Sequence, residues 1–223
     1  MLNNQVCARC DARLKHPLLP WQIGKDYGTD PYRVIFVGKP HRGTPGAITT
    51  SGIIDGSKCA EEYFLEGSSA YWGYTREILR IVFGDANLGW EKIAFTNLIK
   101  CTSVEDGEDA SDKTTETMAR CCMLDLGVFG AELRYLKPKT LVFYTFDFFP
   151  ESLRTLTIET GCKWSDITSS DHRVGRGKRI GWWERECSTS WQNPLRVLVV
   201  GHPQGKTKSE YTNLVANWIR GES

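Results

Sequence analysis

Short, uninterrupted runs of apolar residues recur along the chain and predict the strands of a buried sheet. The runs are Val34–Val37, Ile93–Phe95, Thr140–Tyr144 and Leu195–Val200. Strands that are covered on both faces read as continuous apolar segments of this length, whereas strands with one wet face alternate between apolar and polar residues. The pattern therefore predicts four buried strands in a mostly parallel sheet.

Apolar residues between these runs recur at helical spacing. Gly73–Phe83 and Glu210–Arg220 each predict one helix, and Met118–Leu136 predicts a single long helix that Lys137-Pro138-Lys139 ends. Strands alternating with helices are typical of a three-layer α/β/α domain with a mostly parallel four-stranded sheet. We assign residues 1–223 to one such domain, in which ligands bind beyond the carboxyl ends of the strands.

Two segments fall outside this alternation. Residues 1–30 predict an N-terminal arm that contains cysteines, and residues from about 165 to 192 predict a basic, tryptophan-rich insertion loop. The loop holds Arg173, Arg176, Lys178 and Arg179 beside Trp182, Trp183 and Trp191. Cations interleaved with aromatic rings suit phosphate contact and base stacking, which predicts a surface for double- or single-stranded DNA. The alternative is a solvated insertion whose tryptophans pack on the domain.

Charge and composition narrow the choice of partner and compartment. The net charge of +1 provides no global basic field, so any contact with nucleic acid has to come from a local patch. There is no apolar run of about 18 residues, and the first five residues are not those of a signal peptide. We therefore expect a cytoplasmic monomer with no membrane partner, in which the eight cysteines are reduced or bind metal.

Four cysteines have spacing suited to a metal centre. Cys7 and Cys10 form a C-x2-C pair, Cys101 ends the segment Thr96–Cys101, and one of the tandem residues Cys121 and Cys122 in the predicted long helix would be the fourth. Four thiolates suit either zinc or a [4Fe–4S] cluster, and spacing does not choose between them. Helical phase puts Cys122 on the face of Met118 and Leu126, which leaves Cys121 slightly freer to bind metal. The alternative is that the cysteines are small core residues.

Polar residues follow three of the predicted strands and suit the recognition of a nucleobase. They occur in Gly38-Lys39-Pro40-His41, in Thr96-Asn97 and in Gly201-His202-Pro203. Asn97 offers a donor and an acceptor that can pair with the Watson–Crick edge of a pyrimidine. His202 can donate to a base oxygen as negative charge develops on a departing base. The alternative for His202 is a structural histidine beside a proline.

In these motifs the chain resembles the uracil-DNA glycosylase superfamily, most closely the iron–sulfur-containing family 4 branch. The resemblance runs from Cys7 to about Trp218, and its most specific element is Thr96-Asn97-Leu98-Ile99-Lys100-Cys101. It implies a uracil-DNA glycosylase-like fold and a base pocket lined by Gly38, Lys39, Pro40, Asn97 and Tyr71, with Tyr71 replacing a phenylalanine that stacks on the base. It also implies that His202 stabilises the leaving base, and that Cys7, Cys10, Cys101 and Cys121 hold a [4Fe–4S] cluster.

The first motif departs from the family pattern. No carboxylate occurs between Gly38 and Gly46, where relatives position the attacking water, and His41 is the candidate replacement. We expect a DNA glycosylase that excises a flipped-out uracil or a modified pyrimidine, with a hypermodified cytosine of phage DNA as one option. Base-excision repair and antiviral defence both remain open. Two other classes also remain: a non-catalytic module that captures DNA, and a metal-stapled structural protein.

Overall fold

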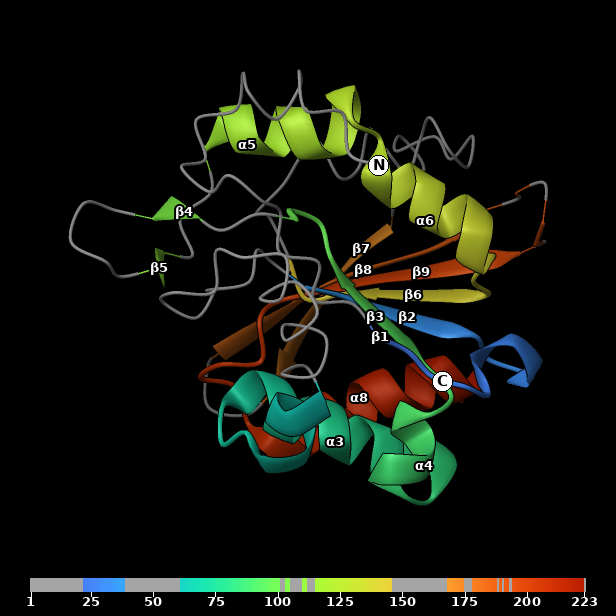
Figure 1. Ribbon diagram of the computed structural model, residues 1–223. Helices are drawn as coiled ribbons and strands as arrows, with labels where there is room; N and C mark the ends of the chain where they lie inside the picture. The colour runs from blue at the N-terminus through green and yellow to red at the C-terminus, as the bar shows by residue number, and fades with distance from the viewer. Residues whose placement is uncertain are drawn as a thin grey trace.

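A computed structural model describes residues 22–38, 61–100, 103–104, 110–111, 115–145, 168–174, 178–187, 189, 191–192 and 194–222. These residues form an α/β protein with helices on both sides of a mixed sheet (Figure 1). Within the described ranges the sheet has seven strands in the order β1-β3-β2-β6-β9-β8-β7. In chain order they are β1 (Gln22–Ile23), β2 (Val34–Gly38), β3 (Ala94–Asn97), β6 (Thr140–Phe143), β7 (Thr168–Val174), β8 (Lys178–Cys187) and β9 (Leu195–Val200). A separate two-stranded sheet pairs β4 (Ser103–Val104) with β5 (Ala110–Ser111).

The four strands predicted from apolar runs are adjacent and mutually parallel in the order β3-β2-β6-β9. Their side chains alternate between the two faces, so that Ile35 and Val37 pack on one side and Val34 and Phe36 on the other. Helices cover both sides, which explains why these strands are apolar at every position. The sheet is larger than the four strands expected, because antiparallel strands extend the parallel sheet at both borders.

Both segments that fall outside the predicted alternation of strands and helices contribute strands to the sheet. The predicted insertion loop forms β7 and β8, which pair with each other, and β8 pairs with β9. The end of the predicted arm, at residue 30, is also too late, because β1 pairs with β3 and Tyr27, in the short 3-10 helix η1 (Tyr27–Thr29), is buried. Sequence patterns did not reveal these strands, because strands without a continuous apolar run are specified mainly by their ladder partners.

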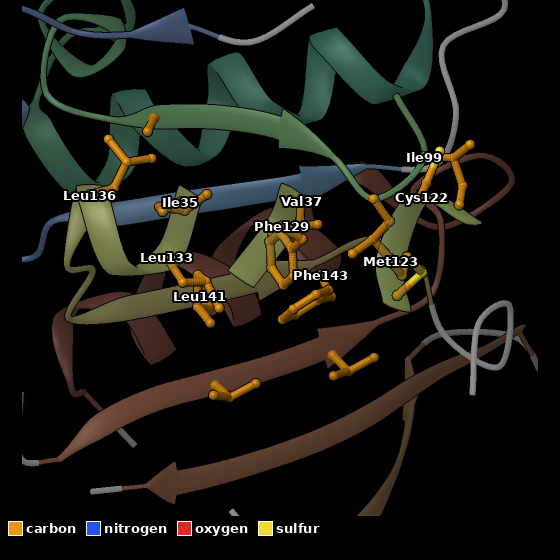
Figure 2. Close-up of a cluster of buried hydrophobic side chains, with 14 of the residues drawn as sticks. Ile35, Val37, Ile99, Cys122, Met123, Phe129, Leu133, Leu136, Leu141 and Phe143 are labelled. Atoms are coloured by element: carbon orange, nitrogen blue, oxygen red, sulfur yellow. The ribbon is translucent and has the colours of Figure 1, made fainter. Parts of the chain in front are cut away.

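One face of the sheet is covered by α3 (Ala70–Phe83), α4 (Ala86–Trp90) and α8 (Lys208–Arg220), with a further helical segment at residues 61–66. The other face is covered by α5 (Glu116–Arg120), the π-helix η2 (Cys121–Asp125) and α6 (Val128–Leu136). Figure 2 shows the core under η2 and α6, where Cys122, Met123 and Phe129 pack toward Ile35, Val37 and Phe143. In the described part of the chain, every helix is too short or too polar to cross a bilayer.

The segment Met118–Leu136 is three consecutive pieces, not one helix as predicted. Leu126 N donates to Cys121 O at 2.9 Å, the i→i+5 bond of a π-turn, and Gly127 then adopts φ 58°, a left-handed conformation that glycine tolerates. Apolar spacing hid the break, because buried residues continue on both sides of it. The irregular turn lies at the tandem cysteines.

Candidate base-binding site

The carboxyl ends of the parallel strands meet at one edge of the sheet. Gly38 of β2 is the register partner of Asn97 of β3, and Val37 is the partner of Phe143 of β6. From β2 the chain proceeds to β3 on one side, whereas β6 lies on the other side and the chain proceeds from it toward β9. In open α/β folds, ligands bind beyond the carboxyl ends of the strands at the point where the connections diverge in this way.

Gly38, Asn97 and Tyr71 converge on one point at this edge of the sheet. A Cβ atom at position 38 would lie 2.4 Å from Asn97 Oδ1 and 2.8 Å from Tyr71 Oη. Only glycine therefore lets the asparagine amide and the tyrosine hydroxyl approach the end of β2 together. Tyr71 comes from the first turn of α3, so three separate elements supply the three residues. Three of the five residues expected to line a base pocket therefore lie together, and their role in binding a base stays a prediction.

Tyr71 lies among aromatic rings. Trp72, Phe95 and Tyr144 meet its ring edge to face, at centroid distances between 4.9 and 5.8 Å. Burial raises the pKa of its hydroxyl well above the usual range, so the group stays protonated. Among the described residues the buried Oη atom has no hydrogen-bond partner, and a hydroxyl in that condition is an energetic cost that a ligand can relieve.

His202 joins this group from the loop after β9. Its ring stacks on Tyr71 at a centroid distance of 5.8 Å with an interplanar angle of 25°. The Gln204 backbone N–H donates to His202 Nδ1 at 3.2 Å. A neutral imidazole that accepts at Nδ1 carries its proton on Nε2, so Nε2 is the donor. The predicted role of His202 requires such a donor.

Tyrosine hydroxyls fix the loop that carries His202. Tyr211 of α8 donates to Gly201 O at 2.7 Å, and Tyr74 of α3 donates to Lys206 O at 2.6 Å. Lys206 N also donates to Pro203 O at 3.1 Å and closes the turn. The role of these tyrosines was not expected from the sequence, because at helical spacing they read as ordinary core residues.

A buried ion pair lies beneath Asn97 and was also not expected. Lys100 Nζ is 2.8 Å from each carboxylate oxygen of Glu132, and their side chains are 2% and 9% exposed. Burial lowers the pKa of Lys100, and the Glu132 carboxylate opposes that shift. The signal that could have revealed the pair is a lysine directly after the apolar residues Leu98 and Ile99, at the end of a buried strand.

Three predicted pocket residues, Lys39, Pro40 and His41, lie outside the described residues, so the water-placing role of His41 stays a prediction. Arg176 of the basic group also lies outside them. Arg173 and Arg179 are register partners in the β7–β8 hairpin, and Lys178 pairs with Val174. Trp182 of β8 pairs with Val200, the last residue of β9, so the residues of β8 that precede Trp182 extend beyond the carboxyl end of β9. The hairpin therefore projects past the sheet on the side of the candidate site.

Only one of the four predicted metal ligands, Cys121, lies among the described residues. Cys7, Cys10 and Cys101 lie outside the described residues. Cys121 is 2% exposed and belongs to neither hydrophobic cluster, whereas Cys122 packs in the core under η2 (Figure 2). Both cysteines are buried, Cys122 being 3% exposed, and the role of Cys121 as a metal ligand stays a prediction. The described residues contain no group of three or more His, Cys, Asp or Glu side chains that could hold a metal ion.

Comparison with known proteins finds no match for the chain, either among models of protein families or among curated proteins.

Proposed function

We propose that the protein is a DNA glycosylase that hydrolyses the N-glycosidic bond of a flipped-out uracil or modified pyrimidine and leaves an abasic site. One observation carries the proposal: Gly38, Tyr71, Asn97 and His202, from four separate elements, meet at the carboxyl edge of the parallel strands. The uracil-DNA glycosylase-like fold belongs to the same proposal. The three-layer arrangement and the β3-β2-β6-β9 order support it.

The base is recognised by its edge and its face. Asn97 supplies one acceptor and one donor to the Watson–Crick edge of the base. Tyr71 supplies an aromatic surface beside it, and its protonated hydroxyl is a further hydrogen-bonding group. A base can reach these groups only when it leaves the duplex stack, which costs a few kcal/mol and favours bases that are already poorly paired.

His202 stabilises the departing base. When the bond between C1′ of the sugar and the base nitrogen breaks, its electron pair moves onto the base, and negative charge collects on the carbonyl oxygens. The Nε2–H of His202 donates to one of these oxygens, and the Gln204 contact at Nδ1 keeps the donor turned outward. A water then bonds to C1′ and gives its proton to the base.

None of Gly38, Tyr71, Asn97 and His202 carries a carboxylate that could position that water. The Glu132 carboxylate is bound by Lys100 and Thr96. His41 is the candidate for this role, as the sequence suggests. A site that relies chiefly on leaving-group stabilisation is the alternative, and the two differ in the activity of a His41→Ala variant.

The projecting β7–β8 hairpin supplies the DNA surface in this proposal. Arg173, Lys178 and Arg179 lie in β7 and β8 next to the end of the hairpin that extends past β9, and Arg176 falls between them in the sequence. Phosphate contacts of this kind position the duplex without reading its sequence.

A [4Fe–4S] cluster held by Cys7, Cys10, Cys101 and Cys121 completes the proposal. It would join the N-terminal arm to the strand end at Asn97 and to the π-turn of η2. Its contribution is structural, and measured iron near four atoms per chain tests it. Zinc at one atom per chain, without iron, would contradict it.

The central experiment is a base-release assay on oligonucleotides that contain uracil, hypoxanthine, 5-hydroxymethylcytosine or glucosylated 5-hydroxymethylcytosine. Abasic product is expected after alkaline cleavage for at least one of them, and the His202→Ala variant is the matched control for contaminating activity. DNA binding without an abasic product for every substrate would instead identify a non-catalytic capture module. If neither DNA binding nor abasic product is detected, only a structural role remains.

A further inference from the structure

Lys100 uses all of its hydrogen-bonding capacity at the end of β3. Its ammonium group donates to Thr96 Oγ1 at 2.6 Å, to Asn97 O at 2.5 Å and to the Glu132 carboxylate at 2.8 Å. Thr96 Oγ1 in turn donates to Glu132 Oε2 at 3.0 Å. The network is closed, and it joins the strand that carries Asn97 to helix α6 on the adjoining face of the sheet.

Burying this ion pair is a poor way to gain stability. Removing two charges from water costs about as much as their attraction returns, and apolar side chains of similar volume often serve equally well. Apolar side chains at these two positions would have apolar neighbours, because Leu98, Ile99 and Leu133, which adjoin Lys100 and Glu132 in the sequence, are fully or almost fully buried. A directional role is therefore the better explanation, since only hydrogen bonds hold a backbone carbonyl in a fixed direction.

We infer that Lys100, held by Glu132, is the positioning residue for Asn97. This inference rests on the proposed function and deepens it, because it states what aims the group that reads the base. Lys100 fixes the carbonyl of Asn97, and Leu98 N on the other side of that peptide donates to Gly38 O at 3.1 Å. The peptide that follows Asn97 is thus held at both its oxygen and its nitrogen.

The side chain of Asn97 is then placed against Gly38. Asn97 is 4% exposed, and its Oδ1 is one of the two atoms that would meet a Cβ at position 38. Because the peptide that follows Asn97 is anchored, the side-chain amide of Asn97 keeps one direction at this edge of the sheet. Without the anchor, the strand end can shift, and a displacement of about 1 Å at a reacting group costs roughly 10²-fold in rate.

The test is the paired substitution Lys100→Met with Glu132→Met, which removes both charges together. If the pair positions Asn97, single-turnover base release should fall by about 10²-fold. The denaturant midpoint should stay close to that of the wild type, because an apolar pair replaces the buried ions. Iron content is measured in parallel, because Cys101 follows Lys100 directly in the chain.

A double-mutant cycle with Asn97→Ala separates positioning from a general structural effect. When Asn97 has already been truncated, the Met pair should cost less than about 2-fold more, because its effect passes through the missing amide. If the rate losses of the Met pair and of Asn97→Ala multiply in full when the substitutions are combined, the inference is overturned. Wild-type activity in the Met pair would also overturn it. The control is Arg80→Met, which breaks the exposed Glu77–Arg80 ion pair on α3 and should change nothing.

A second readout does not depend on catalysis. The side-chain amide resonances of Asn97 in the full-length holoprotein should shift or broaden in the Met pair and stay in place in Arg80→Met. Unmoved resonances in the Met pair would overturn the inference. If the wild type releases no base at all, the proposed function fails, and these resonances alone decide whether Lys100 positions Asn97.

Discussion

The two faces of the sheet hold the candidate site in different ways. On the face covered by η2 and α6, a charged network anchors the strand end at Asn97. On the face covered by α3 and α8, aromatic rings and tyrosine hydroxyls fix Tyr71 and the His202 loop. The group that would read the base therefore depends on ionic hydrogen bonds, whereas the group that would stabilise the leaving base depends on neutral ones. The site thus has a charged half, at Asn97, and an aromatic half, at Tyr71 and His202.

The largest effect is expected at the aromatic half. His202→Ala should lower the single-turnover rate of base release by about 10²–10³-fold, the usual loss for one preorganised donor. DNA affinity should hardly change, because the interaction strengthens only as the bond breaks. Rate and affinity are measured on the same oligonucleotide, and a parallel fall in both would place His202 in binding alone.

A substitution at Gly38 should disturb both halves at once, with an effect on the rate nearly as large. In Gly38→Ala the new Cβ would meet Asn97 Oδ1 and Tyr71 Oη, so both side chains have to turn aside. Base release should fall by about 10²-fold, and discrimination among bases should weaken. Competition assays with paired substrates measure the discrimination. Unaltered selectivity would show that Asn97 does not read the base edge.

The basic hairpin lies outside both halves and should affect binding only. Removing the charges of Arg173, Arg176, Lys178 and Arg179 together should weaken binding to all DNA sequences alike. The slope of log affinity against log salt should fall by about one unit for each phosphate that is no longer neutralised. Titrations at several salt concentrations measure the slope, and an unchanged slope would leave the hairpin as a solvated ribbon.

The smallest effects are expected from single tyrosine hydroxyls. Tyr211→Phe removes the bond to Gly201 O and should slow base release by about 10-fold or less, in keeping with one neutral hydrogen bond. The same variant tests a pH effect. Burial raises the pKa of Tyr211 and of Tyr144, so the folded state keeps both protonated while the unfolded chain ionises above about pH 10.

That difference makes the free energy of unfolding fall as the pH rises above about 10, and each such tyrosine contributes about 1.4 kcal/mol per pH unit. Below that pH the tyrosines contribute their full stabilisation. Urea unfolding between about pH 9 and 11 should show a shallower decline in Tyr211→Phe than in the wild type. Equal declines would mean that Tyr211 also ionises in the folded protein.

Much of the parallel core was predictable from the sequence, because burial on both faces leaves a continuous apolar signal. β9 begins and ends at the predicted residues, and β2, β3 and β6 differ from prediction by one or two residues at an end. The β7–β8 hairpin was not predictable in this way. Its sequence, from Thr168 to Cys187, is largely polar and charged, and strands of that composition are specified by their ladder partner.

The candidate site was predictable only where single residues follow strands. Asn97 and His202 stand at strand ends, and parallel register brings such positions together. The ion pair of Lys100 with Glu132 joins residues 32 positions apart on different elements, and the sequence marks only the lysine, which follows two apolar residues, and not its partner. Tyr71 was expected for its ring alone, and only the structure showed that its buried hydroxyl has no hydrogen-bond partner among the described residues.

The borders of the sheet bear on how the protein behaves at high concentration. In the described part of the chain, β7 is one border strand and carries Asp171, His172 and Arg173 in succession, while β1 at the other border is only two residues long. Charged residues on a border strand, or a border strand too short to template a new ladder, discourage the addition of a strand from another molecule. The hairpin proposed to contact DNA thus also limits edge-to-edge aggregation, and the removal of its charges should be accompanied by a check of solubility.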